Sequence, residues 1–130
     1  MVNPINRILV IDDQAEFIKA ISRHLKREGF IIDSAYDTEV ARRKIDGSVR
    51  MKIRYDLVIM DAAVPNLGAI EILRWVKKNH PKISVIIIMG FGENDMLKET
   101  IRQDLDGYAK KPLTPQKIIS LINNISQKRG

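Results

Sequence analysis

The sequence has no cysteine among its 130 residues, and aromatic residues make up only 5% of it. The lack of cysteine excludes a disulfide framework, a thiolate metal site and a thiol nucleophile. The shortage of aromatics argues against a platform for single-stranded nucleic acid, because such platforms interleave aromatic and basic side chains. Thiol chemistry and base stacking are therefore not expected functions.

Long hydrophobic runs are also missing. The longest one, Val85 to Met89, is far shorter than the roughly 20 residues that cross a bilayer. The first residues, MVNPINRILVIDD, have no basic segment leading into a long apolar stretch and no cleavage-like site, so we expect no signal peptide. These features predict a soluble protein of the cytoplasm.

The formal net charge is +6, from 22 Lys and Arg against 16 Asp and Glu. Such an excess is compatible with an acidic or nucleic-acid partner. The cations, however, are dispersed in short clusters, as is typical of solvated helix faces and ends. A basic nucleic-acid-binding module is therefore a lower-ranked alternative. The apolar content of 45% fits a packed core, and the length predicts one domain over residues 1–130.

The chain alternates short apolar runs with amphipathic segments. The runs predict strands at residues 7–11, 30–35, 56–60, 83–89 and 107–110. Apolar side chains at helical spacing predict helices at about 17–28, 38–45, 69–80, 93–103 and 115–125. Strict alternation with short connections predicts an α/β protein, with a doubly wound parallel sheet covered by helices on both faces.

Three local patterns refine these boundaries. Thr114-Pro115 is typical of an N-cap followed by proline at the first helical position. Asp13 and Glu16 form a D-x-x-E pattern that is typical of a capping box, which is the structural alternative to a functional role for one of the two acids. The basic stretch 46–54 either extends the second helix or forms a surface loop.

Charged residues follow the predicted strands at one edge of the sheet, where ligands bind in folds of this type. The first strand is followed by Asp12 and Asp13, the third by Asp61, and the fifth by Lys111. Converging carboxylates repel one another unless a cation intervenes, and Mg²⁺ accepts oxygen ligands together with waters and a phosphate. An ammonium nearby completes a site for a phosphoryl group.

Each residue also has a purely structural interpretation. Asp13 serves as a helix cap, Asp61 as a turn former, and Lys111 as an exposed lysine beside a proline. Taken together, complementary charges at separate strand ends favour a functional site.

The segments ILVIDDQ, DLVIMDAAVPNLG and GYAKKPLTPQKI resemble the receiver domain of two-component response regulators, of the chemotaxis-regulator type, over nearly the whole chain. The resemblance implies a flavodoxin-like three-layer sandwich with strand order 2-1-3-4-5. It also implies a phosphoacceptor that receives a phosphoryl group from a sensor histidine kinase or a phosphotransfer protein. A downstream effector protein or an output domain would then read the phosphorylated state.

By position, the resemblance makes Asp61 the phosphoacceptor. Asp13 would bind Mg²⁺ directly and Asp12 would assist through water, while Asp61 and the backbone carbonyl of Ala63 would supply further oxygens. Lys111 would pair with the phosphoryl oxygens, after a peptide bond to Pro112 expected to be cis.

The resemblance also assigns two switch positions. Tyr108 stands at the aromatic switch position, with an ordinary half-buried strand tyrosine as the alternative. Met89 stands where the family has a Thr or Ser whose hydroxyl bonds to the phosphoryl group. A thioether has no proton to donate, so the usual coupling should be weak or rebuilt. The family often has an acid and a glycine near the start of the third helix. Here Leu67 is followed by Gly68-Ala69, so the loop after Asp61 is one residue out of step with the family pattern.

Several interpretations remain open. Either Asp61 is phosphorylated and read through a modified switch, or the domain is a degenerate receiver that binds partners without phosphate. A nucleotide or flavin site would need a Gly-rich loop, where the chain has Asp-Asp-Gln-Ala-Glu. An aspartyl phosphatase would need a second acid at the position of Ala63, so we expect no enzyme.

Overall fold

The computed structural model of the chain describes residues 5–61, 68–89, 106–110 and 112–129. Its elements follow one another in the predicted alternation of strands and helices. In chain order they are β1 (Arg7–Ile11), α1 (Ala15–Arg27), β2 (Ile31–Ala35), α2 (Thr38–Arg50), β3 (Leu57–Asp61), α3 (Gly68–Asn79), β4 (Ser84–Met89), β5 (Gly107–Lys110) and α5 (Pro115–Lys128). The helix predicted at residues 93–103 lies outside the described residues.

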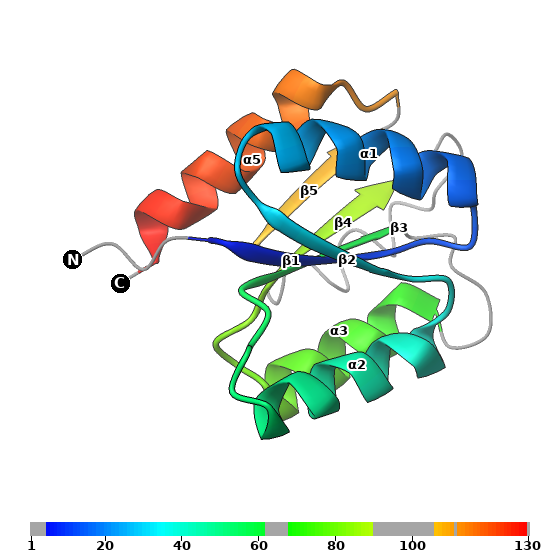
Figure 1. Cartoon of the computed structure of the whole chain (residues 1–130), viewed down its shortest axis with the longest axis vertical. Coiled ribbons are helices and arrows are strands. Elements are labelled where there is room, and N and C mark those ends of the chain that lie inside the picture. Colours follow the sequence, from blue (N-terminus) through cyan, green and yellow to red (C-terminus); the bar gives the residue numbers. More distant parts are fainter. Residues whose placement is uncertain (1–4, 62–67, 90–105, 111, 130) are drawn as a thin grey trace.

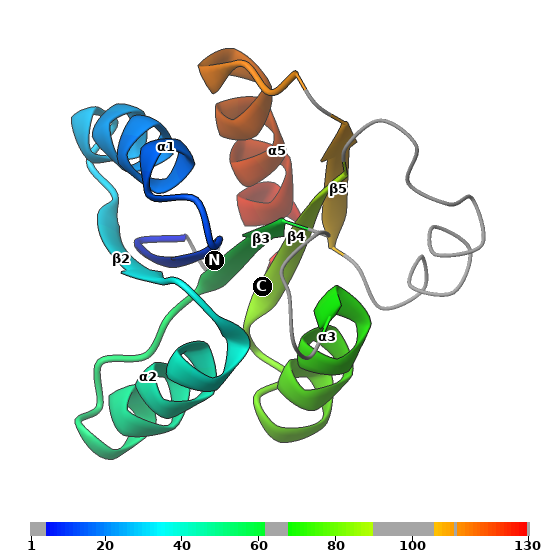
Figure 2. The same ribbon diagram turned by 90° about the vertical axis from the view of Figure 1, so that its right-hand side faces the viewer.

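The five strands form one parallel sheet in the order β2-β1-β3-β4-β5. Helices α1 and α5 cover one face of this sheet, and α2 and α3 cover the other (Figures 1 and 2). The predicted fold class and strand order are therefore confirmed. Among the described helices, none combines the length and hydrophobicity needed to cross a membrane.

Alternating side chains of the central strands divide the apolar core into two parts. On β1, Leu9 and Ile11 pack with residues of α2 and α3, whereas Ile8 and Val10 pack with residues of α1 and α5. Every residue of β3 and β4 is buried, as expected of strands covered on both faces. The carboxyl ends of β1 and β3 are thus fixed by core packing on both sides.

The capping role that Asp13 would have as a purely structural residue is not found at the start of α1. The helix begins at Ala15, and its N-cap, Gln14, makes no side-chain cap hydrogen bond. The backbone N–H of Gln14 instead donates to Oδ1 of Asp12 at 2.9 Å. Asp13 is exposed and is not the N-cap of the helix.

Helix α2 is longer than its apolar spacing predicted. It continues from Thr38 to Arg50, so the basic stretch extends the helix before turning toward β3. The turn has the hydrogen bonds of a Schellman motif: Lys52 N–H donates to Val49 O and Ile53 N–H to Ser48 O. Lys52 occupies the left-handed position with φ of 59°, which glycine usually fills.

Helix α5 begins as predicted. The hydroxyl oxygen of Thr114 accepts a hydrogen bond from the backbone N–H of Lys117 at 3.2 Å, and Pro115 stands at the first helical position. This pairing satisfies one of the helix's free amide groups and fixes the entry of α5 beside β5.

A polar cluster attaches the outer strand β2 to α2 and to the start of β3. The hydroxyl of Tyr55 donates to Oδ2 of Asp33 at 2.6 Å, and the ammonium of Lys44 donates to Oδ1 at 3.0 Å and to Ser34 O at 2.6 Å. Burial opposes ionisation of Asp33, but the hydrogen bonds from Tyr55, Lys44 and the Ser34 N–H outweigh it and lower the pKa of Asp33. The same contact and burial raise the pKa of Tyr55.

We predict that Tyr55→Phe lowers the free energy of unfolding by about 1–2 kcal/mol at pH 7, because it leaves a carboxylate oxygen without its donor. Since the pKa of Asp33 is lowered in the folded state, this contribution exists above the unfolded pKa of about 4. It is lost as the pH falls through the lower, folded value. Urea unfolding measures both effects. Tyr36→Phe, at an exposed tyrosine, is the control, and equal losses in the two variants would contradict the assignment.

Candidate functional site

Asp12 and Asp61 lie side by side where two neighbouring strands end. In the pairing of β1 with β3, Ile11 stands opposite Met60, so the next residue of each strand is an aspartate. Both are buried, with exposed fractions of 2% and 4%. Two buried carboxylates on adjacent strands are costly unless a proton or a cation compensates them.

The backbone fixes the position of Asp12. Its N–H donates to Ala35 O at 3.1 Å, which continues the pairing of β1 with β2. Its Oδ1 accepts the Gln14 N–H, but Oδ2 is buried and has no hydrogen-bond partner among the described residues. Since buried polar atoms are normally paired, this oxygen fits the role of a ligand to a cation.

The surroundings of Asp12 disfavour its charge. Burial raises the pKa of Asp12 to about 6; the hydrogen bond from Gln14 opposes this rise, and the nearby carboxylates of Asp61 and Asp13 add to it. Asp13 adjoins Asp12 in the chain, and Asp61 ends the neighbouring strand, so the three aspartates occupy one region. The structure thus brings together Asp12, Asp13 and Asp61.

These aspartates do not enclose an ion by themselves. Among the described residues, no group of three or more His, Cys, Asp or Glu side chains could hold a metal ion. The arrangement is an open edge with two buried acids and one exposed acid. A cation that tolerates an incomplete protein shell and keeps several waters, as Mg²⁺ does, fits such an edge.

Two predicted parts of the site cannot be placed. Ala63 and Lys111, including the peptide bond to Pro112, lie outside the described residues. The oxygen ligand expected from Ala63 and the ammonium expected from Lys111 therefore stay predictions.

Met89 is the last residue of β4 and is buried. Its side chain belongs to the core under α2 and α3, together with Val85 and Ile87 of the same strand. The sequence interpretation considered only the missing hydroxyl, although the alternation with Val85 and Ile87 already indicates a core position. The residue at this strand end therefore fills apolar volume, and its Cα neighbour across the sheet is Lys110.

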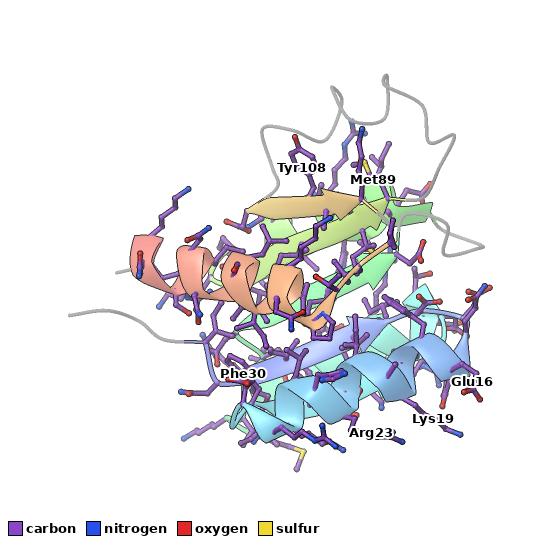
Figure 3. The ribbon with its side chains drawn as sticks, turned by 90° about the horizontal axis from the view of Figure 1, so that it is seen from above. Glu16, Lys19, Arg23, Phe30, Met89 and Tyr108 are labelled. Carbon is purple, nitrogen blue, oxygen red and sulfur yellow. The ribbon has the colours of Figure 1, made fainter. Side chains whose placement is uncertain are left out.

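Tyr108 lies on β5, and nearly half of its side chain is exposed. Figure 3 shows it projecting outward from that strand, on the same side of the molecule as Met89. The proposed switch role stays a prediction.

Comparison with known proteins shows the family of this chain. The family model described as the response regulator receiver domain matches residues 8–123. The chain belongs to this family. It is similar to a solved response regulator receiver domain protein from Clostridium thermocellum, with 30% identity, a TM-score of 0.84, and 95% of this chain and 96% of that one covered.

Curated relatives include short and long proteins. The chemotaxis protein CheY of Thermotoga maritima is 22% identical over 93% of this chain and 98% of its own length. The cell cycle transcriptional regulator CtrA of Caulobacter vibrioides is 28% identical over 92% of this chain but only 49% of its own length. The transcriptional regulatory protein ResD of Bacillus subtilis is 26% identical, with 45% of its length covered. This receiver thus spans about half the length of CtrA and ResD.

We predict that Asp12→Asn raises the free energy of unfolding at pH 7 by about 1–3 kcal/mol in the absence of divalent cations, since it removes a buried charge. The folded pKa of Asp12 is about 6, above the unfolded value of about 4. Between these values the native state holds a proton that the unfolded state releases, so wild-type stability falls as the pH rises through this window. The variant should lack that decrease.

Urea titrations from pH 4 to pH 7 with a chelator present measure this difference. Glu28→Gln is the matched control, because Glu28 is exposed at the far end of α1 from Asp12 and its loss should leave the pH dependence set by Asp12 unchanged. A variant at Asp12 that is less stable than wild type at pH 7 would contradict the assignment.

Proposed function

We propose that Asp61 accepts a phosphoryl group from a sensor histidine kinase or a phosphotransfer protein in the cytoplasm. The observation that carries this proposal is the pair of buried aspartates at adjoining strand ends of a receiver domain. Asp12, Asp13, Asp61 and the carbonyl of Ala63 would hold Mg²⁺. When bound, Mg²⁺ would offset the negative charge that the carboxylates and the incoming phosphoryl oxygens bring together.

The transfer is a substitution at phosphorus. An oxygen of the Asp61 carboxylate forms the new P–O bond, and the P–N bond of the donor phosphohistidine breaks. The electron pair of that bond leaves with the imidazole nitrogen, and the product on this chain is an acyl phosphate. Strand packing holds Asp61 in place for this attack, and Lys111 would pair with the phosphoryl oxygens.

We assign the chain the role of a switch rather than an enzyme. A hydrolase that uses an aspartyl nucleophile needs a second acid to protonate the leaving group, and the position two residues after Asp61 is an alanine. The phosphorylated state would be read by a separate effector protein or by an output domain. The similarity to proteins both of this length and of twice this length is compatible with either.

A second candidate is a degenerate receiver that binds partners without phosphate. The observation that favours it is Met89, because a buried thioether stands where the family has a hydroxyl. Losing a charge-assisted hydrogen bond costs about 1.5–3 kcal/mol, which is similar to a whole allosteric coupling of about 1–3 kcal/mol. Direct nucleic-acid binding rests on net charge alone and ranks below both.

We predict that acetyl phosphate with Mg²⁺ adds one phosphoryl group to the wild type, attached to Asp61. Asp61→Asn should remain unlabelled, and chelating the metal should stop labelling of the wild type. Asp46→Asn, at an exposed aspartate on α2, is a matched control that should label normally. Intact and peptide mass spectrometry measure the adduct. A wild type without any adduct would support the degenerate receiver.

We predict that Met89→Thr increases the structural response to beryllofluoride, a phosphoryl analogue, because it supplies a hydroxyl. Met89→Val is the matched control, since valine has nearly the same shape as threonine without the hydroxyl. Both variants should lose about 1–3 kcal/mol of stability through lost core packing. Amide shift changes report the response, and equal changes in the two variants would show that the hydroxyl does not matter here.

A further inference from the structure

A cavity of about 390 Å³ lies at the amino edge of the sheet, at the opposite ends of the strands from Asp12 and Asp61. The connections from α2 to β3 and from α3 to β4 border it, at the side where the strands begin (Figure 1). Its lining includes the apolar side chains of Val49, Tyr55, Pro81 and Ile83 and the cations Arg54 and Lys82. The volume is within the range of protein ligand sites, about 300–1,000 Å³.

The walls of this cavity are fixed by hydrogen bonds. Oδ2 of Asp56 accepts the backbone N–H groups of Asn6 and Arg7, both at 2.9 Å. Arg129, with 11% of its side chain exposed, donates to Asp56 O at 2.9 Å and to the Ser84 hydroxyl oxygen at 2.7 Å. A preformed cavity avoids the ordering cost that weakens binding by flexible surfaces.

Among the described residues that line the cavity, the charged side chains without an ion pair are positive. Its lining acid, Asp56, is occupied by Arg129 and by the amides of the neighbouring strand. His80 is paired with Asp46 at 3.1 Å. Arg54 and Lys82 are exposed, and neither side chain has an ion pair with a described residue. An anionic group at the rim would therefore find two unpaired cations.

Apolar side chains extend the same surface beyond the cavity. Met51 and Ile53 are 70% and 43% exposed, and they alternate in sequence with Arg50, Lys52 and Arg54. The Schellman turn at the end of α2 holds these residues next to Val49 and Arg54 of the cavity. Exposed large apolar residues rimmed by charge are typical of protein–protein contact surfaces, whereas a small molecule in the cavity would leave them uncovered.

We infer that this amino-edge surface, formed by Val49–Tyr55 and Pro81–Ile83, binds an acidic segment of a partner protein that carries one apolar anchor side chain. The anchor enters the cavity, and flanking carboxylates pair with Arg54 and Lys82. Met51 and Ile53 contact the remainder of the segment. This site lies at the other edge of the sheet from Asp61, so it does not rest on the proposed phosphoryl transfer.

A peptide titration tests this site on the whole chain. The probes are short peptides of glutamates around a single Leu, Met, Phe or Trp, added at up to millimolar concentration and followed by amide shifts. At least one probe should move the resonances of Val49, Tyr55 and Ile83. Replacing the apolar anchor of that peptide by alanine should abolish the shifts. In the protein, the double substitution Arg54→Glu with Lys82→Glu should weaken peptide binding about tenfold or more.

The matched control reverses two exposed cations elsewhere, Lys19→Glu with Arg23→Glu on α1 (Figure 3). It changes the net charge equally and should leave the affinity unchanged. Val49→Phe, which fills the cavity, should abolish binding while circular dichroism shows a folded protein. Equal weakening in both double variants, or shifts from none of the probes, would overturn the proposal. Preferential binding to anionic phosphatidylglycerol vesicles or to duplex DNA through this surface would also overturn it.

Discussion

The parallel pairing of β1 with β3 is the constraint on which the site depends. Backbone hydrogen bonding sets Ile11 opposite Met60. The next residue of each strand is therefore an acid, Asp12 or Asp61, and both acids are buried at the same edge of the sheet. Because both strands pack on two faces, both carboxylates lie where little solvent reaches them. The fold thus stores an unfavourable electrostatic arrangement at one edge, as active sites commonly do.

That arrangement explains why the edge is suited to a cation and a phosphoryl group. Asp12 binds a backbone amide through one oxygen and leaves the other unpaired, while Asp13 remains exposed beside it. A metal ion bound at the free oxygen of Asp12 would add positive charge beside the carboxylates and would raise stability by binding only the native state. Without the metal, the carboxylates that would serve function at this edge lower the stability of the fold. Such a trade-off between function and stability is frequent at functional sites.

Much of the fold could be predicted because it follows from hydrophobic patterning. Continuous apolar runs identified β1, β3 and β4, and the spacing of apolar residues identified the described helices α1, α2, α3 and α5. The failures were local. Asp13 has the sequence pattern of a cap, but the start of α1 uses Asp12, whose backbone is fixed by β2. The apolar spacing placed the end of the second helix near Ile45 and left residues 46–54 open between helix and loop, whereas α2 continues to Arg50 with Ile45 and Ser48 both buried.

The contacts that join distant segments were not predictable in the same way. Two such contacts are the hydrogen bonds of Tyr55 with Asp33 and of Arg129 with Asp56. The partners are far apart in the chain, so no local sequence pattern predicts these pairs. The two described cores lie on opposite faces of the sheet, since successive side chains of a strand enter opposite cores. A change in volume at Met89 should therefore be felt by α2 and α3 before it reaches α1 and α5. A substitution at this strand end of the receiver therefore disturbs one face of the sheet more than the other.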